Sequence, residues 1–145
     1  MEYKVHGDQL AIRLDPGDDL LQSIGKAVAE SGFGSGFVVS CIGALSKARI
    51  TSMLSTMNGM FYAPMRELTG ALELIVASGN VEPKSDGGVK VHLHGLIDSE
   101  FKELVGGHFD DTGNIIGITA EILISRFPGM TRSVPGSSGP AKLNL

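Results

Sequence analysis

The chain has 145 residues, 42% of them hydrophobic and 19% charged, and a formal charge of −4. A chain of this length is expected to form one domain that buries a core of its own. The acidic balance, the dispersion of the 12 Lys and Arg residues and the absence of Trp argue against DNA binding by phosphate neutralisation or base stacking.

A single cysteine excludes an internal disulfide and fits the cytosol. Cys41 lies in the apolar run 37–42, so we expect a small buried side chain rather than a reactive thiol. The N-terminus lacks the apolar core of a signal peptide, and no stretch approaches the ~20 apolar residues of a membrane span. We therefore expect a soluble, cytoplasmic chain.

Two short strands joined at residues 7–9 are predicted within residues 2–14, because apolar residues alternate on both sides of that turn. His6 lies beside the turn and is expected to be solvated rather than a ligand. The acidic turn at 15–19 then begins a helix with apolar residues at helical spacing, and Gly32 is expected to end it.

The Gly-rich stretch 32–36 follows a helix and precedes a strand, which reverses the order of a dinucleotide-binding loop. We interpret it as the exit of the helix into a buried strand at 37–42 that breaks at 43–45. Alternation over 49–57 predicts a further strand. The Met residues at 53, 57, 60 and 65 are expected to fill core gaps or a subunit interface, and a soft ligand-contacting patch is the alternative.

A turn at 58–59 and a loop or edge segment at 61–64 precede a predicted strand at 67–76. This strand is expected to place Leu72, Leu74 and Val76 on one side. Glu73 lies within the apolar run, so its carboxylate must face solvent or be buried with a partner. Residues 81–88 are expected to form a polar hairpin loop.

Strict alternation from Val89 to Ile97 predicts a strand that buries Val91 and Leu93 and places His92 and His94 together on its other side. His108 follows a Gly pair that allows a close backbone approach or a sharp turn. Residues 98–104 predict a turn or bent strand, and 111–114 a turn. The last strand is predicted at 115–127, with Ile116, Ile118, Ala120, Ile122 and Ile124 alternating against polar residues.

The Gly-, Ser- and Pro-rich tail at 128–145 has too little apolar content to pack and is expected to be flexible or draped over a single domain at 1–127. About eight strands connected by hairpin turns, with one principal helix, predict an α+β fold. Its core is a largely antiparallel, strongly twisted sheet with the helix packed on it.

The order of these segments resembles the plant and prokaryote conserved (PPC) domain, also catalogued as a domain of unknown function. The resemblance extends from about residue 10 to 126 and is carried by residues 13–20, 36–38, 41–45, 70–75, 92–94, 105–108 and 119–122. It implies an α+β fold that assembles as a homotrimer. In plants such domains are attached to AT-hook DNA-binding motifs, and stand-alone prokaryotic members are often labelled DNA-binding.

The family's interaction motif, Gly-x-Phe-Glu-Ile-Leu, corresponds to residues 70–75 of this chain. Gly70, Glu73 and Ile75 match in identity or kind, whereas Leu72 replaces the Phe and Leu74 the Ile. No Arg-Gly-Arg-Pro hook occurs in the sequence. We therefore expect DNA contact to be weak or indirect, and partners to be other copies of the chain or other proteins.

Neutral imidazole is the commonest protein ligand for divalent transition metals, so His92 and His94 with His108 as a third ligand predict a metal site. These are also the family's characteristic His positions. Three His and a water match an open zinc site, with zinc the default ion and nickel, iron and copper left open by ligand type. The alternative is a polar or interface cluster of His without metal.

No catalytic residue is assigned, because nothing in the sequence places Glu67, Glu73 or Glu121 beside the His face. Two functions therefore stand. The first is a homotrimeric, metal-binding interaction or regulatory module. The second is a zinc-dependent enzyme that acts on a small molecule in a cleft at a subunit boundary.

Overall fold

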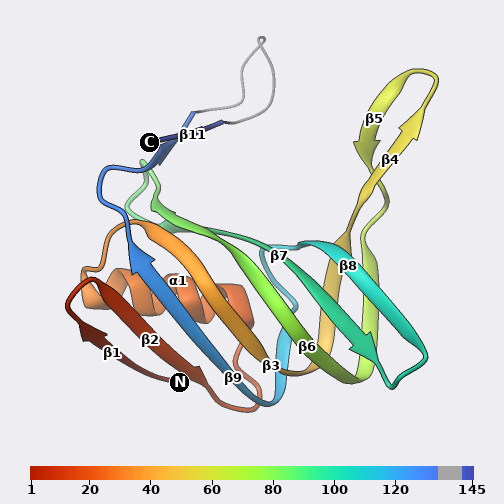
Figure 1. The fold of residues 1–145 in the computed structure, drawn as a ribbon, viewed down its shortest axis with the longest axis horizontal. Helices are drawn as coiled ribbons and strands as arrows, with labels where there is room; N and C mark the ends of the chain where they lie inside the picture. Colours follow the sequence, from red (N-terminus) through yellow and green to blue (C-terminus); the bar gives the residue numbers. More distant parts are fainter. Residues whose placement is uncertain (134–141) are drawn as a thin grey trace.

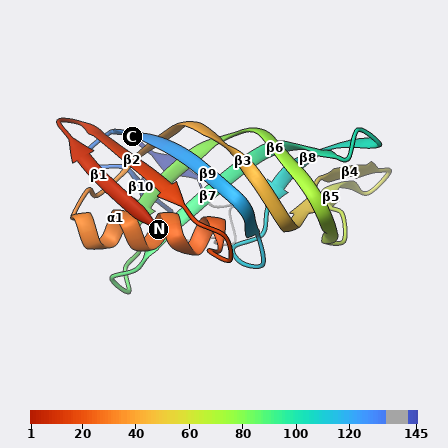
Figure 2. The ribbon, with the colours of Figure 1, turned by 90° about the horizontal axis from the view of Figure 1, so that it is seen from below.

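The structure, a computed structural model, describes residues 1–133 and 142–145. Helix α1 (Leu20–Ser31) packs along one face of a seven-stranded antiparallel sheet (Figure 1, Figure 2), which confirms the predicted α+β class. The strands of this sheet are β1 (Glu2–His6), β2 (Gln9–Leu14), β3 (Gly36–Thr51), β6 (Arg66–Pro83), β7 (Val89–Ser99), β8 (Glu103–Phe109) and β9 (Ile115–Arg126).

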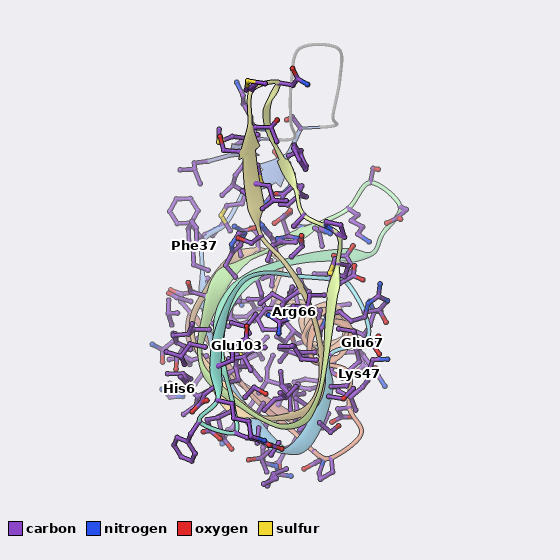
Figure 3. The ribbon with its side chains drawn as sticks, turned by 90° about the vertical axis from the view of Figure 1, so that its right-hand side faces the viewer. His6, Phe37, Lys47, Arg66, Glu67 and Glu103 are labelled. Atoms are coloured by element: carbon purple, nitrogen blue, oxygen red, sulfur yellow. The ribbon has the colours of Figure 1, made fainter. Side chains whose placement is uncertain are left out.

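The strands lie in the order β1-β2-β9-β3-β6-β7-β8. The sheet curls so far that its edge strand β8 also pairs with the end of β3, through Ile50 with Phe109 and Thr51 with His108. Strands β3, β6, β7 and β8 therefore close into a ring, seen end-on in Figure 3, where Arg66 and Glu103 lie toward each other. This closure brings His108 beside both the β7 strand and the end of β3.

Two small hairpins project from the same side of the main sheet (Figure 1). One joins β4 (Met53–Thr56) to β5 (Gly59–Tyr62) and stands away from the body. The other joins β10 (Thr131–Arg132) to β11 (Leu143–Asn144) near the C-terminus. The β4–β5 hairpin turns at residues 57–58, one position before the predicted turn, because Gly59 already pairs with Thr56.

Helix α1 begins and ends where the sequence predicts. The Asp19 carboxylate accepts a hydrogen bond from the Gln22 backbone N–H, and Gly32 ends the helix at a positive φ of 62°. The apolar face of α1 lies against β7. The two are so close at Gly25 that a Cβ there would lie 3.5 Å from the Val91 side chain. The helix thus supports the strand that carries two of the His residues, from the side opposite to them.

The expected break at 43–45 is wrong, since β3 continues through it. Gly43 has extended backbone geometry, and a Cβ there would lie 2.4 Å from the Thr119 carbonyl oxygen of β9. Glycine is required at this position because two strands approach closely, and not because the chain turns. The predicted strand at 49–57 is likewise divided, between the end of β3 and β4.

Irregular pairing changes which side chains face the core. A register shift between Leu74 and Val76 turns Val76 outward, so the expectation that it shares a side with Leu72 and Leu74 is wrong. In β9, Ile118 is 68% exposed although its predicted partners on that side are buried, because the β3–β9 register also shifts there. Strand β6 extends to Pro83, so the polar loop is shorter than predicted.

The described part of the tail touches the main domain at two residues, as the draped alternative for 128–145 predicts. Met130 is buried, and the Arg132 guanidinium binds Glu82 of β6. The prediction of a flexible tail for 134–141 lies outside the described residues. The predictions for Cys41 and His6 are confirmed. Cys41 is buried, and burial raises the pKa of its thiol to about 12. His6 is exposed at its hairpin.

Candidate metal centre

Strands β7 and β8 bring three imidazoles together. His94 pairs directly with His108 across the two strands, and His92 lies two residues earlier on the same side of β7. On the other side of β7, Val91 and Leu93 are buried as the alternation predicts. The position of the cluster therefore follows from strand periodicity plus one cross-strand pairing. We call His92, His94 and His108 the His cluster.

The nitrogen atoms of the His cluster converge on one point. His92 Nε2 lies 3.2 Å from His94 Nε2, and His108 Nδ1 lies 3.4 Å from the same His94 atom. One nitrogen from each ring falls within 4.8 Å of the others. The sequence singled out these three residues, and the structure places them in one cluster.

This spacing fits the ligand set of a tetrahedral ion. Two nitrogen ligands that each lie ~2.0–2.1 Å from zinc at the tetrahedral angle are about 3.4 Å apart. The observed separations of 3.2 and 3.4 Å are close to that value. His92 Nε2 and His108 Nδ1 both lie within hydrogen-bonding distance of the same atom, His94 Nε2.

The surroundings of the cluster favour neutral imidazoles. Burial lowers the pKa of His92 to about 4, helped by the positive charges of His108, His94, Arg132 and Lys90. Burial also lowers the pKa of His108, with further lowering by His94 and Lys90 and an opposing effect of Asp110 and Asp111. Because a metal binds the unprotonated imidazole, these shifts keep His92 and His108 available as ligands at neutral pH.

Both small hairpins contribute to the neighbourhood of the cluster. The Tyr62 ring of β5 lies 5.9 Å from the His108 ring, centroid to centroid. From β10, the Arg132 guanidinium donates to Glu82 at 2.6 Å and to Asn80 at 2.7 Å. Asn80 is the cross-strand partner of His92, so this network borders the His cluster on the β6 side.

The carboxylates considered from the sequence are not among the residues of the cluster. Glu67 binds Lys47 at 3.0 Å. Glu73 and Glu121 each line a groove whose described residues include none of the three His. The buried carboxylate in the network beside the cluster is instead Glu82, which is 1% exposed. The pattern at 81–88 predicted a polar loop, so the burial of Glu82 at the end of β6 was not expected from the sequence.

The residues of the interaction motif divide between core and surface. Leu72 and Leu74 are buried, whereas Gly70, Glu73 and Ile75 lie on the outer side of β6. Glu73 therefore faces solvent, the first of its two expected settings. Gly70 and Glu73 line a groove of about 570 Å³ together with exposed Phe101 and Ile118. The accessible part of the motif is thus a mixed polar and apolar surface.

The Met residues do not fill the core. Met57 is fully exposed and Met60 is 76% exposed, both on the projecting β4–β5 hairpin. Phe61 and Tyr62 of the same hairpin are also exposed. Of the expected roles, the interface remains consistent with these positions.

In the described part of the chain, no helix has the length and apolarity needed to cross a bilayer.

The fold and the His cluster define an α+β protein with a potential metal centre on one sheet. Comparison with known families shows that the chain belongs to the Plants and Prokaryotes Conserved (PCC) domain family, whose model matches residues 1–128. The resemblance drawn from the sequence is confirmed. Arg132 lies beyond the matched residues.

Solved structures share this fold. A PPC protein from Pyrococcus horikoshii is 25% identical, with a TM-score of 0.75, and covers 99% of this chain and 95% of its own. A metal-containing protein from Archaeoglobus fulgidus is 28% identical, with a TM-score of 0.73, and covers 95% of this chain and 93% of its own. A protein from Bacteroides thetaiotaomicron, provisionally assigned as DNA-binding, has a TM-score of 0.80 at 17% identity over 99% of this chain and 96% of its own.

Among curated proteins, the chain is similar to part of the bifunctional protein GlmU from two Synechococcus strains. The identity is 34% over 117 residues in one strain and 32% over 114 residues in the other. These matches cover 81% and 79% of this chain, but the chain spans only 16% of the length of these relatives.

Proposed function

We propose that this protein is a metal-binding interaction or regulatory module that works as a homotrimer. The observation that carries the proposal is the separation of 3.2 and 3.4 Å between imidazole nitrogens, which suits three ligands of one ion. Zinc is the metal we propose, because three neutral His and no thiolate form a set that zinc commonly accepts. The similarity to a metal-containing archaeal protein supports the same proposal.

The proposed ion would have a fourth coordination position for water or a ligand, since the His cluster supplies three nitrogens. His94 is exposed, so this position is accessible from outside the protomer. Bound metal would fix β7 against β8 at the pair His94 and His108. The chemistry it would supply is Lewis acidity at the open position.

The trimer is supported by apolar surface that one protomer leaves uncovered. The β4–β5 hairpin exposes Leu54, Met60 and Phe61, and the outer face of the sheet exposes Val39 and Ile118. Exposed apolar groups that lie side by side, as Leu54 and Phe61 do across this hairpin, are typical of an interaction site. Gly70, Glu73 and Ile75 would present a second surface, for other proteins.

We propose that contact with DNA is weak or indirect. The formal charge of −4 opposes phosphate binding, and no AT-hook sequence occurs in the chain.

We place the module in the cytoplasm, because its single thiol, Cys41, is buried and unpaired as in proteins of reducing compartments.

A zinc-dependent enzyme at a subunit boundary is the second candidate. It is favoured by one observation, the exposure of His94 at a three-ligand cluster, which leaves the proposed ion open to a substrate. None of the carboxylates considered from the sequence serves as its general base, because Glu67, Glu73 and Glu121 lie away from the His cluster. We therefore prefer the interaction module.

Metal analysis of the purified protein tests the proposal. We expect about one zinc ion per chain after preparation without chelators, or after reconstitution. Replacing a ligand should reduce zinc affinity by 10-fold or more, so His92→Ala and His108→Ala should lose the metal. His6→Ala is the matched control and should retain it, because His6 lies on the distant β1–β2 hairpin. A wild-type protein that binds no metal under either condition would contradict the proposal.

A further inference from the structure

The C-terminal segment places a cation beside the His cluster. Asn80 pairs with His92 across β6 and β7, and Glu82 pairs with Lys90, so these four side chains project from the same side of the sheet. Arg132 of β10 binds both β6 residues, through Nε to Glu82 Oε1 and through Nη2 to Asn80 Oδ1. The guanidinium therefore lies over β6, next to the strand that carries His92.

Among the described residues, the Arg132 guanidinium makes two hydrogen bonds, which fix its orientation and leave its other donors unused. An Arg–carboxylate pair is frequently bidentate, with two parallel hydrogen bonds. Here only one Glu82 oxygen is bonded, and its buried Oε2 has no partner among the described residues. The second donor turns to Asn80, on the His92 side. A guanidinium has about five N–H groups, and these two bonds use two of them. The remaining N–H groups of Arg132 have no acceptor in the described part of the chain.

Lys90 lies on the same side of β7 and is held by a carboxylate of its own. Its Nζ is engaged by both oxygens of Asp111, at 2.5 and 2.7 Å. Asp110, which also lies near His108, is paired with Arg49 at 2.8 Å. Among the described residues, Arg132 therefore keeps more free donors next to the cluster than Lys90 does.

These contacts point to a ligand of defined chemistry. Three neutral imidazoles leave the charge of a divalent ion uncompensated, so its open position favours an anion over water. A planar guanidinium is the side chain best suited to oxygen pairs of a carboxylate or phosphate. We infer that the His-bound metal and Arg132 together form a binding site for a small oxyanion, a carboxylate or phosphate group. This inference rests on the proposed metal site.

The test uses the full chain loaded with Co²⁺, whose visible absorption reports changes at its open position. Inorganic phosphate and acetate are titrated separately at constant ionic strength, with chloride as the reference salt. We expect phosphate, acetate or both to change the spectrum saturably. Tighter binding of phosphate would identify a phosphate group as the preferred ligand, and tighter binding of acetate would identify a carboxylate.

Variants distinguish the contribution of Arg132 to anion binding from that of the metal. Arg132→Gln should weaken binding of the anion about tenfold, the effect expected for loss of charge-assisted hydrogen bonds, and should leave Co²⁺ affinity within about twofold. The double variant Glu82→Gln with Arg132→Gln removes the same cation without leaving a buried carboxylate unpaired, and should behave alike. Arg13→Gln, on the far strand β2, is the matched control and should bind the anion as the wild type does.

The outcomes distinguish this inference from the function on which it rests. If the wild type binds no Co²⁺, the proposed metal function fails. If Co²⁺ binds but neither anion changes its spectrum, the oxyanion site is refuted and the metal site stands. If the anion binds equally well to wild type and both Arg132 variants, the role of Arg132 is refuted.

Discussion

Protonation of His92 is opposed by its position in the fold. Its pKa is lowered to about 4, mainly by burial, from a value near 6.5 in an unfolded chain. Between pH 6.5 and 4 the unfolded state therefore binds more protons than the folded state. The neutral state of His92 therefore favours the folded protein fully above about pH 6.5, and this contribution to the free energy of unfolding is lost as the pH falls toward 4.

The corresponding prediction concerns the metal-free protein. In the presence of a chelator, the free energy of unfolding should fall more steeply from pH 6.5 to 4 in the wild type than in His92→Gln. The difference should be smaller than the full pKa shift implies, because His92 is only partly buried and solvent screens its charge. Urea unfolding of both proteins at four or five pH values measures it. Parallel curves would show that His92 contributes nothing to the pH dependence.

Gly79 controls the register of the strand that carries His92. A Cβ at Gly79 would lie 1.8 Å from the His92 carbonyl oxygen, and this backbone atom cannot move without shifting β7. We expect Gly79→Ala to destabilise the protein by about 1–3 kcal/mol, the usual cost of overpacking. Metal affinity should fall as well, since the His92 ring moves with its backbone.

A nearby glycine provides the control for this prediction. At Gly106 of β8, a Cβ would meet its nearest atom, in the Leu96 side chain, at 3.5 Å, which is ordinary contact. Gly106→Ala should therefore leave both stability and metal affinity nearly unchanged. Urea unfolding and Co²⁺ titration compare the two variants. Equal effects at both positions would exclude the close approach at Gly79 as the cause.

At the scale of elements, the sequence predicts what depends on local periodicity. Strand β7 and the His side of it follow from strict alternation, and α1 follows from helical spacing and its caps. The lengths of β3 and β6 do not follow, because register shifts interrupt the alternation that would reveal them.

The candidate site shows the same division. His92 and His94 share a side by periodicity alone, whereas His108 was added because of the Gly pair before it and the family resemblance. The contact of Arg132 with Glu82 joins residues 50 positions apart, and the composition of the tail, which predicted a flexible or draped segment, gave no sign of it. Contacts of this range are set by how the whole sheet curls, and no local pattern encodes them.

The β4–β5 hairpin is an element that one protomer does not stabilise. Both of its sides carry apolar groups, with Met53 opposite Tyr62 on one and Leu54 opposite Phe61 on the other. An isolated two-stranded hairpin is marginally stable in water. We infer that neighbouring protomers cover it in the proposed trimer.

A double substitution tests this role. Met60→Ser with Phe61→Ser should weaken self-association and lower the mass measured by light scattering, from about three times the 15.2 kDa of one chain toward one. Val5→Ser, an exposed apolar residue on the opposite edge strand β1, is the matched control and should leave the mass unchanged. A wild-type mass of one chain would refute the trimer itself. A variant that remains trimeric would exclude the hairpin from the interface.

In the whole molecule, the helix and the candidate sites lie on different faces of the sheet. Helix α1 covers one face of the sheet, whereas the His cluster lies on the side of β7 turned away from the helix. Arg132 and the accessible residues of the interaction motif also lie outside the core. The proposed metal, anion and partner surfaces therefore all depend on a rigid sheet that α1 supports from behind.

The charge distribution of the whole molecule predicts how it behaves toward DNA. The chain has a formal charge of −4, and nine of its 12 Lys and Arg side chains, all of them described by the structure, lie within 4.0 Å of a carboxylate. Cations that already have partners release few counterions when they meet phosphates, so the salt-dependent gain in affinity is small. We expect no mobility shift of random or AT-rich duplexes at ~150 mM salt with micromolar protein. Any complex seen at low salt should disappear as salt is added. A complex that persists at ~150 mM salt would show that the protein binds DNA directly, against its overall charge.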